Sequence, residues 1–209
     1  IPYVCDVIKH GSAPMTPTDG ARQTPWRIDM MMQPTAAESA EMLAYFEGQE
    51  AAWARCQRGD WMLWYLLGRV SELTFRKLAW KLALETRVNE EVCTNSAMSP
   101  EAKARMYSVF DYLTGDIDST ELHRCWSESW TKGHHLGEQD NDAQMNANCA
   151  AASVLQEDAV HAALAAAEFA CRAAGSLAAL RGFEYDRAYN DARQDQADLI
   201  REMLPELPL

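Results

Sequence analysis

The chain has 209 residues, of which 48% are hydrophobic, so it is long enough and apolar enough to bury one sizeable core. A charged fraction of 24% and a mean hydropathy of −0.34 argue against a membrane protein, and a soluble cytoplasmic protein is expected. The formal net charge of −12 disfavours direct binding to nucleic acid, because such proteins need clustered Lys and Arg to displace counterions.

The N-terminal region predicts an extended arm. The segment from Gly11 to Trp26 carries three prolines and two glycines, which prevent regular structure. Thr35 and Glu38 then have the spacing of a capping box, which predicts the start of the first helix, and Gly48 is expected to end it. We therefore divide the chain into an arm, residues 1–34, and a helical domain, residues 35–209.

A short helix, residues 51–57, is expected next, followed by a helix that is apolar almost all round. Asp60 is the predicted N-cap of this second helix. Trp61 and Trp64 are predicted to anchor neighbouring helices from within it, and Gly68 to end it. Such a helix must be buried.

Ser71 is expected to open a longer helix that runs to about Val92. Trp80 is one of its predicted core residues. Its basic side chains form the one basic face expected in the protein: Arg76, Lys77, Lys81 and Arg87.

Two further helices follow. Ser99 and Pro100 supply an N-cap and an N1 proline for a helix that runs to Gly115. Asp118 and Ser119 start another, which carries the predicted core residue Trp126 and ends near Trp130. Residues 132–141 then read as a long polar loop.

Residues 143–180 contain sixteen alanines, which predicts a strong, thin helix that neighbouring helices can approach closely. Gly182 ends this stretch, and a last helix is expected from Tyr185 to Met203. No strand is expected beyond the first eight residues. The predicted fold is all-α: a single-domain antiparallel bundle of about eight helices with an extended Pro-rich N-terminal arm.

Six cysteines lie far apart, with no C-x-x-C pair, and are expected to be reduced. The best candidates for metal ligands are His134, His135, Glu138 and Asp140. They lie in a predicted loop without helical i, i+4 geometry to position them, so no metal and no cofactor is expected.

Glu157, Asp158 and His161 fall within one helical turn, where a carboxylate can orient an imidazole for acid–base work. The same spacing is common on a solvated helix face, which is the favoured interpretation. The chain has no G-x-x-x-x-G-K-[ST], G-x-G-x-x-G or G-x-S-x-G motif, so nucleotide binding and α/β-hydrolase chemistry lose their usual support. A protein that is not an enzyme is expected.

The segment C-x-x-G-D-W-x-L-W, Cys56 to Trp64, resembles a group of small bacterial and bacteriophage immunity proteins, the Imm-five-like group. The order of the later segments is similar too, up to the ending Q-A-D-L-I-R-E-M-L-P, residues 196–205. The resemblance implies an α-helical protein, linked to toxins or phages, that neutralises another protein by binding it. The resemblance implies no catalytic residues, and it implies that Asp60, Trp61 and Trp64 have structural roles.

Charge suggests where such a partner binds. Residues 1–100 hold 12 acidic and 10 basic residues, a net of −2, whereas residues 101–209 hold 19 and 9, a net of −10. We therefore expect a protein partner with a basic surface. The candidate contacts on the last helix are Asp186, Asp191, Asp195 and Asp198.

Other functions stay open. They are a phage counter-defence protein of the DNA-mimic or anti-CRISPR kind, a phage structural or assembly protein, and a metal-dependent helical enzyme. A homodimer also stays open.

Overall fold

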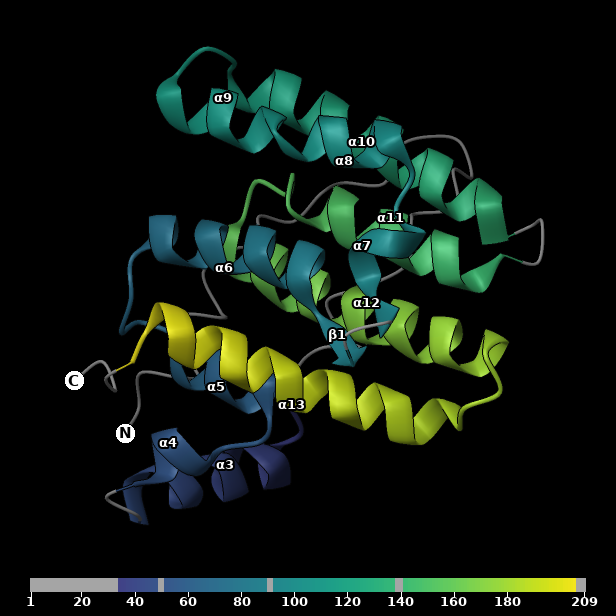
Figure 1. Ribbon diagram of the computed structural model, residues 1–209. Helices are drawn as coiled ribbons and strands as arrows, with labels where there is room; N and C mark the ends of the chain where they lie inside the picture. The colour runs from purple at the N-terminus through teal and green to yellow at the C-terminus, as the bar shows by residue number, and fades with distance from the viewer. Residues whose placement is uncertain (1–33, 49–50, 90–91, 138–140, 206–209) are drawn as a thin grey trace, which may run out of the picture. The chain divides into compact units, whose positions relative to one another are not determined.

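Figure 1 shows the computed structural model of the chain. The structure describes residues 34–48, 51–89, 92–137 and 141–205. Its contacts divide the chain between Gln33 and Pro34, and only the second unit is described here. The predicted arm, apart from Pro34, lies outside the described residues, as do the candidate ligands Glu138 and Asp140.

The described part is mostly helical, with one pair of short strands. The elements, labelled as in Figure 1, are α3 (Ala36–Gly48), α4 (Ala52–Arg55), α5 (Gly59–Tyr65), α6 (Glu72–Glu85), β1 (Arg87–Asn89), β2 (Val92–Cys93), α7 (Thr94–Ala97), α8 (Pro100–Met106), α9 (Ser108–Thr114), α10 (Ser119–Gly137), α11 (Asp142–Ser153), α12 (Ala159–Leu180) and α13 (Tyr185–Met203). The all-α prediction is therefore correct at the level of helical content.

Local capping signals are where the sequence places them. The hydroxyl of Thr35 accepts a hydrogen bond from the Glu38 amide at 3.2 Å, and the Glu38 carboxylate accepts one from the Thr35 amide at 2.9 Å. Ser99 caps α8 in the same way, by accepting from Ala102 N. Gly115 ends α9 with φ of +82°, a conformation that costs glycine least.

The helix predicted to reach Val92 is too long. It ends at Glu85, and β1 and β2 form an antiparallel pair in place of its last turns. Val92 is fully buried against Ala178 and Ala188, with Val88 packed beside them. The Asp195 carboxylate also accepts a hydrogen bond from the Arg87 amide. These contacts with α12 and α13 hold the segment extended, and the sequence-based prediction of no strand here is wrong.

The prediction of a polar loop over residues 132–141 is also wrong for the first half of that segment. Helix α10 continues to Gly137 and carries both His134 and His135. The rings of Trp126, Trp130 and His134 follow one another along it, with centroids 6.1 and 4.9 Å apart, and Phe169 packs on Trp130. This packing continues the helix into a segment whose composition is typical of a loop.

The alanine-rich stretch is two helices, α11 and α12, instead of one. Arg76, fully buried on α6, donates hydrogen bonds to the carbonyl oxygens of Gln156 and Glu157 in the connection between them. A helix running through this point would bond those carbonyls internally. The buried guanidinium replaces those bonds.

Helix α12 lies at the centre of the fold, with α6, α11 and α13 packed around it (Figure 1). Many of its alanines are fully buried, and its Gly175 leaves room for the ring of Tyr185, since a Cβ there would lie 2.9 Å from that ring. Among the described residues, α12 is the helix long and apolar enough to cross a membrane, with a mean hydropathy of 1.3. Because 61% of that window is buried inside the structure, it is compatible with the core helix of a soluble protein.

Candidate partner-binding surfaces

The segment C-x-x-G-D-W, Cys56 to Trp61, packs against α13 and holds α5 beside it. Gly59 has no room for a side chain, since a Cβ would lie 2.7 Å from Gln196 Cβ and 3.1 Å from the Arg193 carbonyl oxygen. Arg201 of α13 donates a hydrogen bond of 2.6 Å to the Cys56 carbonyl. The residues that carry the family resemblance therefore serve helix packing.

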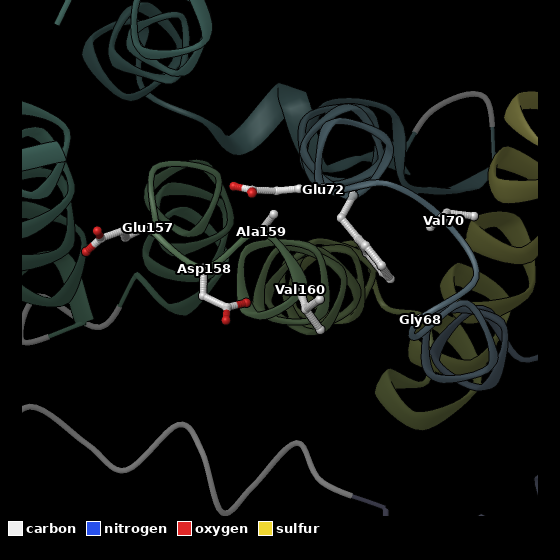
Figure 2. A pocket seen from close by; sticks show the side chains of 8 residues that line it. Gly68, Val70, Glu72, Glu157, Asp158, Ala159 and Val160 are labelled. Atoms are coloured by element: carbon white, nitrogen blue, oxygen red, sulfur yellow. The ribbon is translucent and has the colours of Figure 1, made fainter. Parts of the chain in front are cut away.

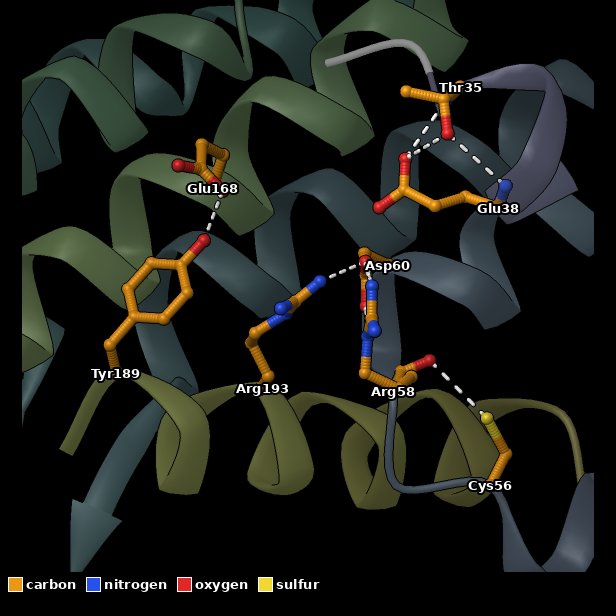
Figure 3. Close-up of polar contacts among 8 residues, drawn as sticks. All are labelled: Thr35, Glu38, Cys56, Arg58, Asp60, Glu168, Tyr189 and Arg193. Carbon is orange, nitrogen blue, oxygen red and sulfur yellow. Dashed lines mark hydrogen bonds and ion pairs between the residues drawn. The ribbon is translucent and has the colours of Figure 1, made fainter. Parts of the chain in front are cut away.

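Asp60 is not the N-cap of α5. The helix begins at Gly59 with Arg58 as its cap residue, so Asp60 lies inside the first turn. Its carboxylate forms an ion pair with Arg58 at 2.6 Å and another with Arg193 of α13 (Figure 3). Burial acts to raise the pKa of this carboxyl, but the two guanidinium groups outweigh it and hold the pKa below its usual value.

The tryptophans predicted for the core are only half-buried: Trp61, Trp64, Trp80 and Trp126. Trp61 lies edge-on to Tyr45, with ring centroids 5.9 Å apart, and carries the Arg58 guanidinium over its face. Of the tryptophans that the structure describes, Trp53 and Trp130 are the buried ones, each 5% exposed. The spacing of apolar residues along a helix predicts which tryptophans face inward, but it does not predict what fraction of each side chain is buried.

A second polar cluster joins α12 to α13. The Tyr189 hydroxyl donates a 2.6 Å hydrogen bond to Glu168 (Figure 3). Glu168 also accepts from Arg172 at 2.7 Å. Burial is the main cause that raises the pKa of Tyr189. A tyrosine that resists ionisation and a carboxylate that accepts from two donors are suited to anchoring one helix to another.

Only the two histidines of the four metal candidates lie in the described part of the chain. His134 stacks on Trp130, and burial lowers the pKa of its imidazole. His135 is exposed, and the two acidic candidates lie outside the described ranges. Within those ranges no group of three His, Cys, Asp or Glu side chains is arranged to hold a metal ion.

The pair of Asp158 and His161 is an N-cap. The Asp158 carboxylate accepts from the His161 amide at 2.9 Å, while the imidazole Nδ1 is 3.6 Å from the same oxygen. The carboxylate therefore caps α12, and the imidazole lies beyond hydrogen-bonding distance of it.

The candidate acids on α13 divide into two sets. Asp191, Asp195 and Asp198 are spaced by four and three residues and share one face of the helix, whereas Asp186 lies five residues before Asp191 and faces elsewhere. The side chains of Asp191 and Asp198 are 47% and 64% exposed. Asp195 is only 20% exposed, because it binds Arg87.

Each member of this face has a basic neighbour within the molecule. Arg187 is 3.9 Å from Asp191, and Arg201 is bound to Asp198. The basic face predicted for α6 is also smaller than expected, because some of its basic side chains are buried or paired within the molecule. Arg76 is buried, and Lys81 pairs with Glu85 and with Glu202 of α13 at 3.0 and 3.1 Å.

A shallow groove of about 590 Å³ opens between the start of α6 and the start of α12 (Figure 2). The apolar side chains of Val70, Phe75 and Val160 line it. Glu72 and Asp158 stand at its rim and are 66% and 59% exposed, whereas Glu157 points away from the other labelled residues in Figure 2. The groove thus combines apolar walls with negative charge.

Exposed apolar side chains gather at two places. One set lies in and just before α9, and its members are Tyr107, Phe110 and Leu113; Leu73 is exposed separately on α6. The other lies at the turn between α12 and α13, and its members are Leu180, Phe183 and Tyr185. Sequence analysis does not predict either set, because apolar residues in and beside helices are expected to face the core.

Comparisons of the chain with protein-family models, with curated proteins and with solved structures give no match.

Proposed function

We propose that the chain is a non-enzymatic binding protein of the immunity or inhibitor type, which neutralises a toxin or defence protein that presents a basic surface. The observation that carries this proposal is the acidic face of α13. Its carboxylates Asp191 and Asp198 are about half or more exposed, and within the described part of the chain each pairs with an arginine of the same helix.

Such exposed pairs contribute little to stability, roughly 0 to 1 kcal/mol each. A Lys or Arg of a partner can therefore replace the intramolecular arginine at small cost. The excess of acids over bases in residues 101–209, 19 against 9, adds a long-range attraction for a basic protein. The acid-rimmed groove beside α6 offers the same charge with apolar walls that suit the stem of a lysine or arginine.

The roles found for polar residues support binding over catalysis. Asp60, Glu168 and Asp158 each hold helices or a helix end in place. The resemblance of Cys56 to Trp64 to immunity proteins points in the same direction.

The test is binding to purified toxins or defence proteins that present a basic surface, measured by calorimetry at several salt concentrations. The α13 variant replaces Asp186, Asp191 and Asp198 by Asn. Asp195 is kept, because it holds Arg87. We expect affinity to fall by about tenfold or more and its salt dependence to weaken.

A groove variant and a control separate the surfaces. The groove variant combines Glu72→Gln with Asp158→Asn, which keeps the hydrogen-bonding oxygens toward Arg76 and the α12 cap. The control removes three exposed acids elsewhere, by Glu41→Gln, Glu47→Gln and Glu101→Gln. The proposal fails if the α13 and groove variants bind as tightly as the control.

A further inference from the structure

Helices α8 and α9 carry a row of three side chains with a basic residue at one end and an acidic residue at the other. The row is Lys103, Tyr107 and Asp111, at intervals of four residues. Tyr107, between the two helices, has φ −68° and ψ −19°, so the helical path continues through it and the three side chains stay on one side. Tyr107 is 55% exposed.

Both ends of this row are unpaired. Within the part of the chain that the structure describes, neither the Lys103 ammonium nor the Asp111 carboxylate has a hydrogen bond or an ion pair. Most of the other exposed charges nearby are engaged. Arg124, for example, binds both Glu121 and Glu128 of its own helix.

Exposed aromatic side chains lie at the centre of the row. Tyr107 is flanked by Phe110 of α9, which is 38% exposed, with ring centroids 6.2 Å apart. Trp80 of α6 packs against both rings, with its centroid 6.1 Å from that of Tyr107 and 5.8 Å from that of Phe110. Clustered aromatic side chains of this kind are typical of the centre of a protein interface.

We propose that this surface binds a second copy of the chain, with α8–α9 of the two copies packed antiparallel around a two-fold axis near Tyr107. Lys103 and Asp111 are equally far along the chain from Tyr107. Antiparallel packing therefore places Lys103 opposite Asp111 of the partner subunit, and the two-fold axis repeats the contact.

The charge pattern selects this occupant over others. A uniformly basic partner would meet Lys103, and a uniformly acidic partner would meet Asp111, but the antiparallel copy satisfies both. The dimer is weak and reversible. Two copies of net charge −12 repel each other, so a Kd on the order of micromolar is expected.

The test is sedimentation velocity of the full chain over roughly 1 to 500 µM, which spans the dissociation range of weak dimers. We expect a concentration-dependent dimer. Tyr107→Ala should weaken it by about tenfold or more, because an aromatic residue is lost from the centre of the interface. Circular dichroism checks that each variant keeps its helical content.

A charge swap tests the geometry itself. Lys103→Asp alone, or Asp111→Lys alone, places like charges opposite each other twice and should weaken the dimer by about tenfold. The double variant Lys103→Asp with Asp111→Lys restores opposite charges at both contacts and should return Kd to within about threefold of the original. A packing that does not bring Lys103 opposite Asp111 of the partner subunit does not predict that rescue.

The control is Phe183→Ser, at the separate exposed apolar turn between α12 and α13, which should leave Kd unchanged. A chain that stays monomeric over the whole concentration range overturns the proposal. The proposal is also overturned if the single charge reversals leave Kd unchanged, or if the double variant dimerises no more tightly than the single variants. None of these outcomes bears on the acidic face of α13, so the proposed function is tested separately.

Discussion

At the scale of single residues, Asp60 joins two helices through its carboxylate. The side chain is 31% exposed and lies between Arg58 and Arg193, which is itself 20% exposed. Removing the carboxylate leaves the Arg193 guanidinium partly buried without its counter-ion. A group in this position costs more to lose than an exposed ion pair.

We predict that Asp60→Asn lowers the free energy of unfolding by about 2 to 3 kcal/mol at pH 7. The pKa of Asp60 is lowered in the folded chain, so its contribution is complete above the unfolded pKa of about 3.9 and is lost as the pH falls through the lower folded pKa. The difference between the two proteins should therefore shrink below about pH 4. Urea unfolding from pH 7 to pH 3 measures it.

The control is Asp198→Asn on the exposed face of α13, where the carboxylate is 64% exposed. It should change stability by less than about 1 kcal/mol. A difference for Asp60→Asn that stays constant down to pH 3 would contradict the lowered pKa.

Gly59 is the second residue that makes the contact between α5 and α13. We predict that Gly59→Ala costs about 1 to 3 kcal/mol, because the new Cβ overlaps Gln196 Cβ and the backbone of α13 cannot yield freely. Gly68→Ala is the matched control. Gly68 has φ of +72°, and a Cβ added there would have nothing within 4 Å. The substitution therefore costs only about 1 kcal/mol, for holding an alanine in a left-handed backbone conformation. Thermal unfolding of the two variants should rank them in this order, and the reverse order would refute the close approach.

At the scale of elements, neighbours decide how far each helix runs. Helix α10 extends past Trp130 because an aromatic row and Phe169 pack along it. Helix α6 ends at Glu85 because α12 and α13 hold the next segment as a strand. The local composition favoured a loop after Trp130 and a helix after Glu85. In both cases the burial of side chains against neighbouring elements outweighed that preference.

The tryptophans of α4 and α5 test what these elements bury. We predict that Trp53→Ala costs about 3 to 5 kcal/mol, because Trp53 is 5% exposed, packs on Phe46 and donates from its indole to the Leu204 carbonyl. Trp64→Ala should cost clearly less, about 1 to 2 kcal/mol, because Trp64 is half-buried. Urea unfolding measures both. Equal losses would show that α5 is as deeply buried as its composition predicts.

At the scale of the whole molecule, the described part from Pro34 onward is organised around α12. The contacts of α12 with α6, α11 and α13 connect helices that are far apart in the sequence. The buried cysteines are distributed over this core: Cys56 precedes α5, Cys149 lies in α11 and Cys171 lies in α12. Burial raises the pKa of Cys149 to about 12 and raises that of Cys171 as well.

We predict that these three thiols react with iodoacetamide only when the whole domain unfolds, so that their labelling rates share one urea dependence. Cys93 and Cys125, which are half-buried, should label first. Mass spectrometry of peptides labelled over time distinguishes the sites. Separate urea dependences for Cys149 and Cys56 would show that α11 and α5 open independently.

The sequence by itself determined the helical class, the capping box at Thr35, the Ser99 cap and the last helix, because these depend on neighbours within a few residues. Only the tertiary structure decided where α6 and α10 end, which tryptophans are covered and what Asp60 binds. Those outcomes depend on which elements pack together, and several of the contacts join residues more than a hundred positions apart, such as Arg193 with Asp60 and Asp195 with Arg87. The same limit applies to the candidate surfaces: acidity could be counted from composition, but which carboxylates are exposed and which are paired depends on how α13 lies against α5, α6 and β1.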